Sequence, residues 1–471
     1  MRYVSTRGEA PPLGFIDVTL AGLARDGGLY VPESWPRLTP TDIAGLAGKP
    51  YAEAAVEVIR PFVGDTVSEA DLSRLAREAY GTFRHPAVVP LVQLNASTFL
   101  LELFHGPTLA FKDVAMQLLT RLMDHALAAR GERATVVVAT SGDTGGAAVE
   151  AFRGRERADL FVLFPQGRIS DVQRAMMTTA REDNVHAIAI EGTFDDCQAI
   201  VKGLFNHHGF RDRVRLSGVN SINWARIVAQ VVYYFTAAVA LGSPHRKIAF
   251  TVPTGNFGDI FAGYVAARMG LPIDRLVIAT NVNDILVRTL ATGSYDLRDV
   301  VATSSPSMDI QVSSNFERLL FEAHGRDSRA VRAAMASLAQ SRHFSIASRA
   351  LEEIRATFSA GRADEEETAA AIRTVRRETS RLIDPHTAVG VAVAEKEVRD
   401  PALPMVVLST AHAAKFPDAV EAACGTRPAL PDWLADLPSR PERATTMPVD
   451  QGAVEKFILA ASRAAREGAA A

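Results

Sequence analysis

The feature of this sequence that most constrains its fold is an alternation between short β-branched runs and helical segments. Each run is followed by a turn of small residues and then by helical apolar spacing. Strands that alternate with helices in this way form βαβ units with a parallel sheet. The pattern therefore predicts an α/β fold whose strands lie at residues 135–139, 160–164, 186–190, 247–252, 275–279 and 405–408.

The two ends of the chain differ from this alternating region. Residues 1–85 combine turn signals with helical apolar spacing at 51–60 and 70–80, which predicts a mainly helical N-terminal unit. Prolines between 428 and 448 indicate an extended connection, and the Ala-rich end after Val454 indicates a surface helix. A chain of 471 residues is long enough for two to four domains, at roughly 100–200 residues each.

Composition narrows the classes of function. With 51 basic and 54 acidic side chains the net charge is −3, too near neutral for a protein held to nucleic acid or to a membrane by its charge. No apolar run reaches the ~20 residues that span a bilayer, and residues 1–10 lack the apolar core of a signal peptide. Two cysteines and the isolated pair His207-His208 give no metal-ligand spacing. We therefore expect a cytoplasmic protein that acts on a small molecule and binds no metal.

Polar turns follow three of the predicted strands. The first is Thr140-Ser-Gly-Asp-Thr-Gly-Gly146, the second is Pro253-Thr-Gly-Asn-Phe-Gly-Asp259 and the third is Ser409-Thr-Ala-His412. Ligands of parallel sheets bind at the carboxyl ends of the strands, where backbone N–H groups at a helix start attract carboxylates and phosphates. We expect these turns at the edge of one sheet, with helices beginning near Ala147 and Ile260.

The second turn has the features of a phosphate site. Gly255 and Gly258 allow a tight backbone, and we expect positive φ angles and a close backbone approach there. Asp259 would repel a phosphate, so we expect its side chain to cap the following helix and to turn away from the ligand. Neither a dinucleotide fingerprint nor a P-loop occurs in the sequence, so NAD and ATP are poorly supported.

Lysine is scarce in this chain, and one lysine has the surroundings of a nucleophile. Only seven of the 51 basic side chains are lysines, and lysine can lose its proton as arginine cannot. Lys112 follows the apolar residues 109–111 and precedes an apolar helix, so that burial and the helix N-terminus both favour its neutral amine. Lys415 is the second candidate, or else a helix-end cation. A reactive lysine beside a phosphate site in an α/β protein is what pyridoxal phosphate (PLP) chemistry requires.

Several long motifs then occur in the order known from one enzyme family. The chain resembles the threonine synthase family, PLP-dependent enzymes of the tryptophan-synthase-β fold type (fold type II), in the longer form found in bacteria and fungi. The motifs that carry the resemblance are Tyr3–Gly8, Asp26–Pro32, His105–Asp113, Ala139–Gly145, Val219–Arg226, Gly255–Asp259, Ser314–Arg318, Asp384–Val389 and Ser409–His412.

The resemblance implies a domain division and a set of site residues. Residues 1–85 would form the family's N-terminal domain, 86–428 a PLP-binding α/β core of two lobes, and 429–471 a C-terminal extension. Lys112 would hold the cofactor as a Schiff base, and Thr410 would face its pyridine nitrogen. The cofactor phosphate would lie against Gly255, Asn256, Phe257, Gly258 and Asp259, and the substrate against Ser141, Gly142, Asp143 and Thr144.

The resemblance also implies a reaction. O-phospho-L-homoserine and water would give L-threonine and phosphate by γ-elimination and β-addition, the last step of threonine biosynthesis, with Lys112 as the proton carrier. Candidates for binding the substrate phosphate are Arg168, Arg226 and Arg318, for each of which a surface or structural ion pair is equally open. The family usually has proline where this chain has Ala413, which leaves the role of His412 open.

Two other functions fit the same sequence features. A related PLP-dependent lyase would release a 2-oxo acid, ammonia and phosphate from a phospho-amino acid. A non-catalytic protein could use the same turns to bind a phosphate-bearing ligand. For any of these functions a monomer or a homodimer is expected.

Overall fold

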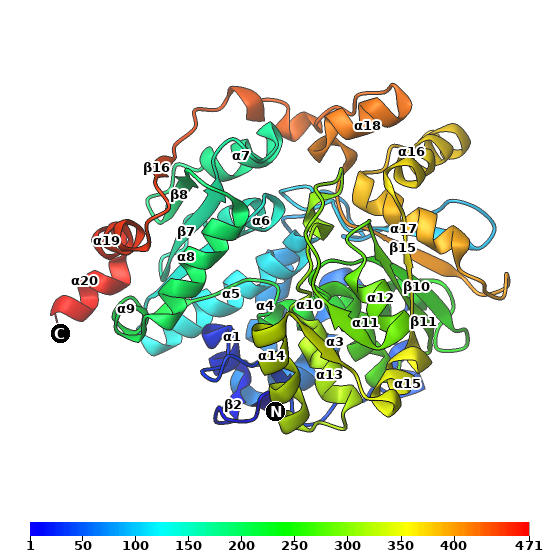
Figure 1. The fold of residues 1–471 in the computed structure, drawn as a ribbon, viewed down its shortest axis with the longest axis horizontal. Coiled ribbons are helices and arrows are strands. Elements are labelled where there is room, and N and C mark those ends of the chain that lie inside the picture. Colours follow the sequence, from blue (N-terminus) through cyan, green and yellow to red (C-terminus); the bar gives the residue numbers. More distant parts are fainter. Residues whose placement is uncertain (471) are drawn as a thin grey trace.

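Two parallel sheets organise the chain in the computed structural model, which describes residues 1–470 (Figure 1). The first sheet has five strands in the order β16-β8-β7-β6-β9, and every neighbouring pair is parallel. Its strands are β6 (Ala134–Ala139), β7 (Ala158–Pro165), β8 (Val185–Ile190), β9 (Leu216–Ser217) and β16 (Thr445–Met447).

The second sheet has six strands in the order β14-β11-β10-β15-β5-β4, parallel except for the antiparallel pair β4-β5. Its strands are β4 (Leu91–Gln93), β5 (Thr98–Glu102), β10 (Ile248–Pro253), β11 (Ile273–Thr280), β14 (Phe358–Arg362) and β15 (Met405–Ser409).

All six predicted strands are present, but the prediction that their turns lie on one sheet is wrong. The first polar turn follows β6 in the first sheet, whereas the other two turns follow β10 and β15 in the second sheet. Hydrophobic periodicity shows where strands occur and carries no information on which strands pair.

Buried helices lie between the N-terminal unit and the two sheets. Helix α10 (Trp224–Ala240) is apolar on nearly all sides, which is typical of a helix inside a core. It packs on α3 (Tyr51–Val63), α5 (Lys112–Arg130) and α11 (Gly258–Arg268). Since α5 and α11 each begin at one of the predicted site motifs, this packing fixes the two helix starts relative to each other.

The N-terminal unit is mainly helical, as predicted, and also contains a small antiparallel sheet that was not predicted. The sheet has the order β2-β1-β3, and the hydroxyl of Tyr3 on β1 donates a 2.7 Å hydrogen bond to the carbonyl of Phe62. The ring of Tyr3 also packs on that of Trp224, with 5.9 Å between ring centroids. The elements are β1 (Arg2–Ser5), β2 (Leu13–Gly14), α1 (Phe15–Ala21), β3 (Tyr30–Pro32), α2 (Pro40–Ala44), α3 and α4 (Glu69–Tyr80).

Further helices accompany each sheet. Those of the first sheet are α6 (Asp143–Phe152), α7 (Asp171–Thr178), α8 (Phe194–Asn206) and α9 (His208–Arg213). Those of the second are α12 (Ile285–Thr292), α13 (Phe316–Ala323), α14 (Ser328–Ser341), α15 (Ser348–Thr357), α16 (Glu365–Thr379), α17 (Pro385–Lys396) and α18 (Pro417–Cys424), with a hairpin of β12 (Ser294–Asp296) and β13 (His343–Ser345).

After α18 the chain returns to the first sheet. Figure 1 shows the orange-to-red segment running from α18 to β16, α19 (Gln451–Ala461) and α20 (Arg463–Ala470). The predicted extended connection therefore supplies an edge strand, β16, which pairs with β8. A strand of three residues has too few positions for a periodic signal, so it was not predicted. Ala471 lies outside the described residues, and none of the helices in residues 1–470 is both long and apolar enough to cross a bilayer.

Candidate active site

Lys112 is the first residue of α5, and its side chain is only 12% exposed. Its Nζ donates a 3.3 Å hydrogen bond to Oδ2 of Asp143. Burial lowers the pKa of Lys112, and the nearby charges of Lys415 and Arg226 lower it as well, whereas the carboxylate of Asp143 raises it. The amine can therefore lose its proton at a lower pH than an exposed lysine, as a nucleophile or base must.

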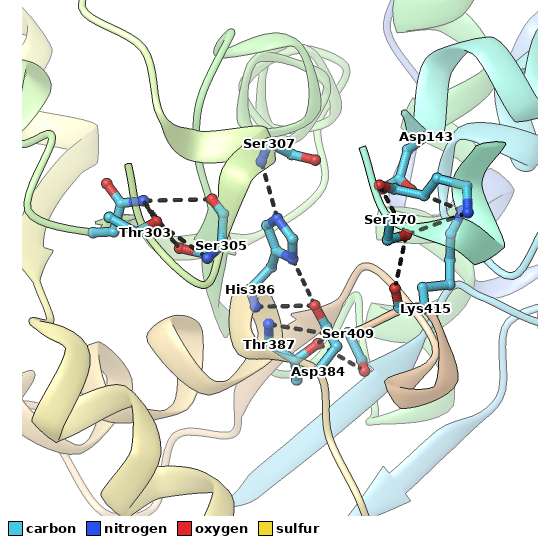
Figure 2. A network of polar contacts seen from close by, with 12 residues as sticks. Asp143, Ser170, Thr303, Ser305, Ser307, Asp384, His386, Thr387, Ser409 and Lys415 are labelled. Carbon is cyan, nitrogen blue, oxygen red and sulfur yellow. Dashed lines mark hydrogen bonds and ion pairs between the residues drawn. The ribbon is translucent and has the colours of Figure 1, made fainter. Parts of the chain in front are cut away.

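Asp143 contacts two lysines and a glutamine, and Figure 2 shows its contact with Lys415. Its Oδ1 lies 2.7 Å from Nζ of Lys415 and accepts a 2.9 Å hydrogen bond from Nε2 of Gln173. Burial alone would raise the pKa of Asp143, but the charges of Lys415 and Lys112 outweigh it and hold the pKa well below its usual value. The carboxylate is therefore ionised throughout the physiological range.

Lys415 is fully buried and is not the helix-end cation that the sequence left open. Besides Asp143, its Nζ contacts the carbonyl oxygen of Thr108 at 2.9 Å. The short turn that carries Lys415 is capped by His412, whose Nδ1 accepts a 3.1 Å hydrogen bond from the N–H of Ala414. His412 thus has a structural role, which helps to place the second lysine.

The turn that precedes Asp143 is shorter than predicted. Helix α6 begins at Asp143 and not near Ala147, so that of the predicted turn only Thr140, Ser141 and Gly142 lie outside it. Gly142 has a φ of 143°, and a Cβ there would lie 2.4 Å from the side chain of Gln173. Among the described residues, none accepts a hydrogen bond from the N–H groups of Ser141, Asp143 or Thr144. These three donors are therefore available to an anionic ligand group.

The turn after β10 presents unused backbone donors. From Gly255 to Asp259, none of the N–H groups donates a hydrogen bond to another residue in the described part of the chain. Helix α11 begins at Gly258, two residues before the predicted start. Consecutive free N–H groups at the start of an eleven-residue helix form an anion site of the kind that binds phosphate.

The backbone of this turn differs from the prediction in detail. Neither Gly255 nor Gly258 has a positive φ, and the left-handed residue is Phe257, with a φ of 64°. Close approach explains Gly255, because a Cβ there would lie 2.7 Å from the backbone oxygen of Ser307. At Gly258 the nearest protein atom is 3.4 Å away, which leaves room for a methyl group among the described residues.

Asp259 does not cap α11, so that prediction is wrong. Its Oδ1 accepts hydrogen bonds from the hydroxyls of Tyr233 and Tyr234, the latter at 3.1 Å. Its Oδ2 is buried and has no hydrogen-bond partner among the described residues. Burial raises the pKa of Asp259 to about 7, against the lowering effect of the two tyrosine hydroxyls and of Lys112.

Thr410 follows the end of β15 and lies next to the segment that carries Lys112. Its backbone carbonyl accepts a 2.8 Å hydrogen bond from the N–H of Phe111. Its hydroxyl makes no hydrogen bond with any residue from 1 to 470, although the residue is only 6% exposed. A free hydroxyl can donate to or accept from a ring nitrogen.

The three candidate arginines have different environments. Arg318 is fully buried and structural, because Nε donates to the carbonyl of Tyr30 at 3.0 Å and Nη2 to that of Ile222 at 2.6 Å. Arg226 is also buried, but it has no carboxylate partner among the described residues, and its Nε has no partner there at all. Arg168 is exposed. Of the three, Arg226 alone is a buried cation with a side-chain nitrogen that has no partner among the described residues.

The donors present fit pyridoxal phosphate. An amine of lowered pKa suits its aldehyde, free N–H groups at a helix start suit its phosphate, and a free hydroxyl suits its pyridine nitrogen. In residues 1–470 no cluster of His, Cys, Asp and Glu side chains could hold a metal ion. Gln173 was not predicted from the sequence, because it forms its hydrogen bond with Asp143 from 30 positions further along the chain. For Lys415, the only signal in the sequence was the scarcity of lysine.

Comparisons with known proteins agree with this site. Three family models match the chain: "Threonine synthase N terminus" at residues 2–80, "Pyridoxal-phosphate dependent enzyme" at 82–410, and "Threonine synthase, C-terminal" at 387–458. The threonine synthase of Pseudomonas aeruginosa is 54% identical over 459 residues, which cover 97% of this chain and 98% of that protein. That of Saccharomyces cerevisiae is 41% identical and covers 89% of this chain and 88% of its own length.

Solved structures give the same answer. The crystal structure of PLP-bound threonine synthase from Brucella melitensis is similar with a TM-score of 0.96 and 62% identity, covering 98% of this chain and all of that one. The yeast threonine synthase structure has a TM-score of 0.92 at 38% identity and covers 98% of each chain. With family models over most of its length and relatives this close, the chain belongs to the threonine synthase family of PLP-dependent fold type II enzymes.

Proposed function

We propose that this enzyme converts O-phospho-L-homoserine and water to L-threonine and inorganic phosphate, and that Lys112 carries its cofactor. The observation that supports the proposal most is the convergence of three features on one site. Lys112 has a lowered pKa, the turn from Gly255 to Asp259 has free N–H donors, and Thr410 has a free hydroxyl. Strands β10 and β15 are parallel neighbours, so the latter two groups follow adjacent strand ends.

Each group has an assigned role toward the cofactor. The N–H groups of Gly255, Asn256, Phe257, Gly258 and Asp259 bind its phosphate, and the hydroxyl of Thr410 forms a hydrogen bond with its ring nitrogen. When bound, PLP supplies an electrophilic carbon for the substrate amine and a ring that withdraws electrons from the substrate.

Lys112 moves the protons of the reaction. Its neutral amine takes a proton from Cα of the substrate and returns it at the end, and the lowered pKa favours this neutral form. The ammonium that results lies beside the ionised carboxylate of Asp143, at 3.3 Å in this structure. Asp143 therefore stabilises the protonated form of Lys112 at the moment when that form is produced.

The substrate's anionic groups have candidate partners on the first lobe and on α10. We assign the α-carboxylate to the turn of Ser141, Gly142, Asp143 and Thr144, in which the N–H of Gly142 is bound internally to Thr140 and those of the other three are free. We assign the γ-phosphate to Arg226, a buried guanidinium without a carboxylate partner in the described chain. Burying an unpaired cation is costly unless an anion compensates it, as a phosphate would.

The setting of the enzyme follows from the same features. All assigned groups come from a single chain, so we propose a monomer or a homodimer in which each subunit holds a complete site. Both cysteines are free, as suits the reducing cytoplasm in which we place the enzyme. We also propose the domain division 1–85, 86–428 and 429–471.

Product analysis tests the proposal directly. The purified holoenzyme is incubated with O-phospho-L-homoserine while threonine, phosphate, ammonia and 2-oxobutanoate are measured. Equal amounts of threonine and phosphate are expected. Phosphate with 2-oxobutanoate and ammonia, but without threonine, would identify the lyase, and a colourless protein that binds phosphate without turnover would identify a binding protein.

A further inference from the structure

His386, near the start of α17, lies between a buried carboxylate and a backbone N–H group (Figure 2). Its Nδ1 is 2.7 Å from Oδ2 of Asp384, and its Nε2 is 3.2 Å from the backbone nitrogen of Ser307. A carboxylate only accepts and a backbone N–H only donates. These two contacts fit the tautomer that carries its proton on Nδ1 and has an acceptor at Nε2.

Asp384 holds this ring in a fixed orientation. The carboxylate is fully buried and also accepts hydrogen bonds from the N–H groups of His386 at 2.9 Å and of Thr387 at 3.2 Å. The hydroxyl of Thr387 bonds to the same carboxylate and lies 3.1 Å from the hydroxyl of Ser409 at the end of β15. His386 is thus anchored to the strand that leads into Thr410.

On its other side, His386 meets the turn that covers the phosphate loop. The backbone oxygen of Ser307 lies 2.7 Å from the position that a Cβ on Gly255 would occupy, so this turn rests directly on the loop. The hydroxyl of Ser313, farther along the same segment, donates a 2.6 Å hydrogen bond to the carbonyl of Gly255. A displacement of Ser307 would therefore change the position of Gly255, where the free N–H groups begin.

We propose that His386 is a positioning residue for the cofactor phosphate. Its Nε2 holds the N–H of Ser307, which keeps the turn pressed against Gly255 and fixes the loop 255–259 in its phosphate-binding conformation. His386 acts through Ser307 and not on the reacting atoms. The inference rests on the proposed assignment of this loop to the cofactor phosphate, and it adds a residue that fixes the shape of the loop.

Packing alone is the competing explanation, and three substitutions separate the two. The ring of His386 lies against that of Phe416, with 4.8 Å between centroids, so its volume also has a structural use. His386→Phe keeps the volume and removes both polar atoms. His386→Asn keeps a donor near Nδ1 for Asp384 but has no atom that reaches Ser307. His386→Gln places an amide oxygen near the Nε2 position, where it can accept from Ser307.

The first readout is the affinity of each apoenzyme for PLP, measured by absorbance titration without substrate. The Phe and Asn variants are expected to bind PLP about tenfold more weakly, as befits the loss of one buried hydrogen bond, and the Gln variant within about twofold of wild type. The second readout is the ³¹P NMR shift of the bound cofactor phosphate, which should move in the Phe and Asn variants and stay in the Gln variant.

A half-buried histidine supplies a control. His186 on β8 stacks on Phe161 with 4.5 Å between centroids, and its Nε2 has no hydrogen-bond partner among the described residues. His186→Phe should change neither readout. If the His386→Asn variant does not fold, the Phe variant decides, since packing alone predicts that it keeps wild-type affinity.

The proposal is overturned if the Phe variant binds PLP with wild-type affinity and ³¹P shift, or if the Gln variant loses as much affinity as the Phe variant. Its failure is distinct from failure of the proposed reaction. A wild-type enzyme that binds PLP but makes no threonine refutes the reaction alone, because both readouts here are taken without substrate.

Discussion

Nζ of Lys415 lies 2.7 Å from Oδ1 of Asp143, and the two groups form an ion pair that is almost completely enclosed. The other oxygen of Asp143 accepts a hydrogen bond from Lys112. The charge on Lys415 therefore lies close to the amine that we assign to the cofactor and lowers its pKa. The site therefore contains two buried lysines around one carboxylate.

Lys415→Met should slow the attachment of PLP to the apoenzyme at neutral pH. The ammonium of Lys415 lowers the pKa of Lys112, so its removal raises that pKa and leaves less of the neutral amine. The pH profile of the attachment rate should therefore shift to higher pH. Stopped-flow absorbance measures the rate, and Lys415→Arg, which keeps the charge, is the control. An unchanged profile for Lys415→Met would show that Lys415 does not influence Lys112.

Alanine at the two loop glycines should separate folding from cofactor binding. Gly255→Ala forces a Cβ to within 2.7 Å of the backbone of Ser307 and should cost about 1–3 kcal/mol in the free energy of unfolding. Gly258→Ala meets no protein atom closer than 3.4 Å, so stability should change by less than about 1 kcal/mol. Its Cβ still crowds the free N–H groups, and PLP affinity should fall at least about tenfold. Denaturation and PLP titration of the two variants provide the test, and wild-type PLP affinity in Gly258→Ala would place the phosphate elsewhere.

Asp259 should make the stability of the apoenzyme depend on pH. Burial raises its pKa from 3.8 to about 7, so the folded protein holds this proton more tightly than the unfolded chain does. The stability that the protonated carboxyl contributes is present below pH 4 and is lost as pH rises toward 7. Relative to wild type, Asp259→Asn should therefore gain stability between pH 4 and 7, by on the order of 4 kcal/mol in total. Urea midpoints of both proteins across this range measure the effect, and parallel curves would mean that Asp259 is ionised in the folded state.

Thr410 should set the electron-withdrawing strength of the cofactor ring. A hydroxyl is too weak an acid to keep the pyridine nitrogen protonated, whereas a carboxylate there would favour the charged ring. Thr410→Asp is therefore expected to bind PLP but to lose threonine formation, with long-wavelength absorbance accumulating when substrate is added. Thr410→Ser should keep much of the activity, and Thr410→Val should lose more because it cannot form the hydrogen bond. Rapid-scanning spectra and threonine assays are the measurements, and an Asp variant with wild-type behaviour would remove Thr410 from the ring nitrogen.

The local features of the site could be predicted from the sequence, whereas the contacts between distant segments could not. Lys112 and the polar turns were found from short motifs, and each motif lies at a helix start or strand end, although the turns belong to two sheets and two helices begin earlier than predicted. The ion pair of Lys415 with Asp143 joins positions 272 residues apart, and no local pattern encodes such a contact. The hydrogen bonds from Tyr233 and Tyr234 to Asp259 could not be predicted either, because an acidic residue at a helix start is expected to cap the helix.

The division into two sheets illustrates the same limit at the level of the fold. Strands β6 and β10 have equally clear apolar runs, but they belong to different sheets because the chain crosses between lobes through α10. The backbone of the second turn shows the same limit. Positive φ was predicted for Gly255 and Gly258, but the residue with the left-handed conformation is Phe257, which lies between them. Tertiary packing determines each of these features, and periodicity and turn chemistry report only the local preference.

Of the two buried lysines beside Asp143, we assign the cofactor to Lys112 and not to its neighbour Lys415. Borohydride reduction of the holoenzyme fixes the covalent bond between PLP and the lysine, and peptide mapping then identifies the residue. We expect a single pyridoxyl group on Lys112, and a Lys112→Ala variant without a reducible adduct and without turnover. A pyridoxyl group on Lys415 in the wild-type enzyme would show that this assignment is wrong.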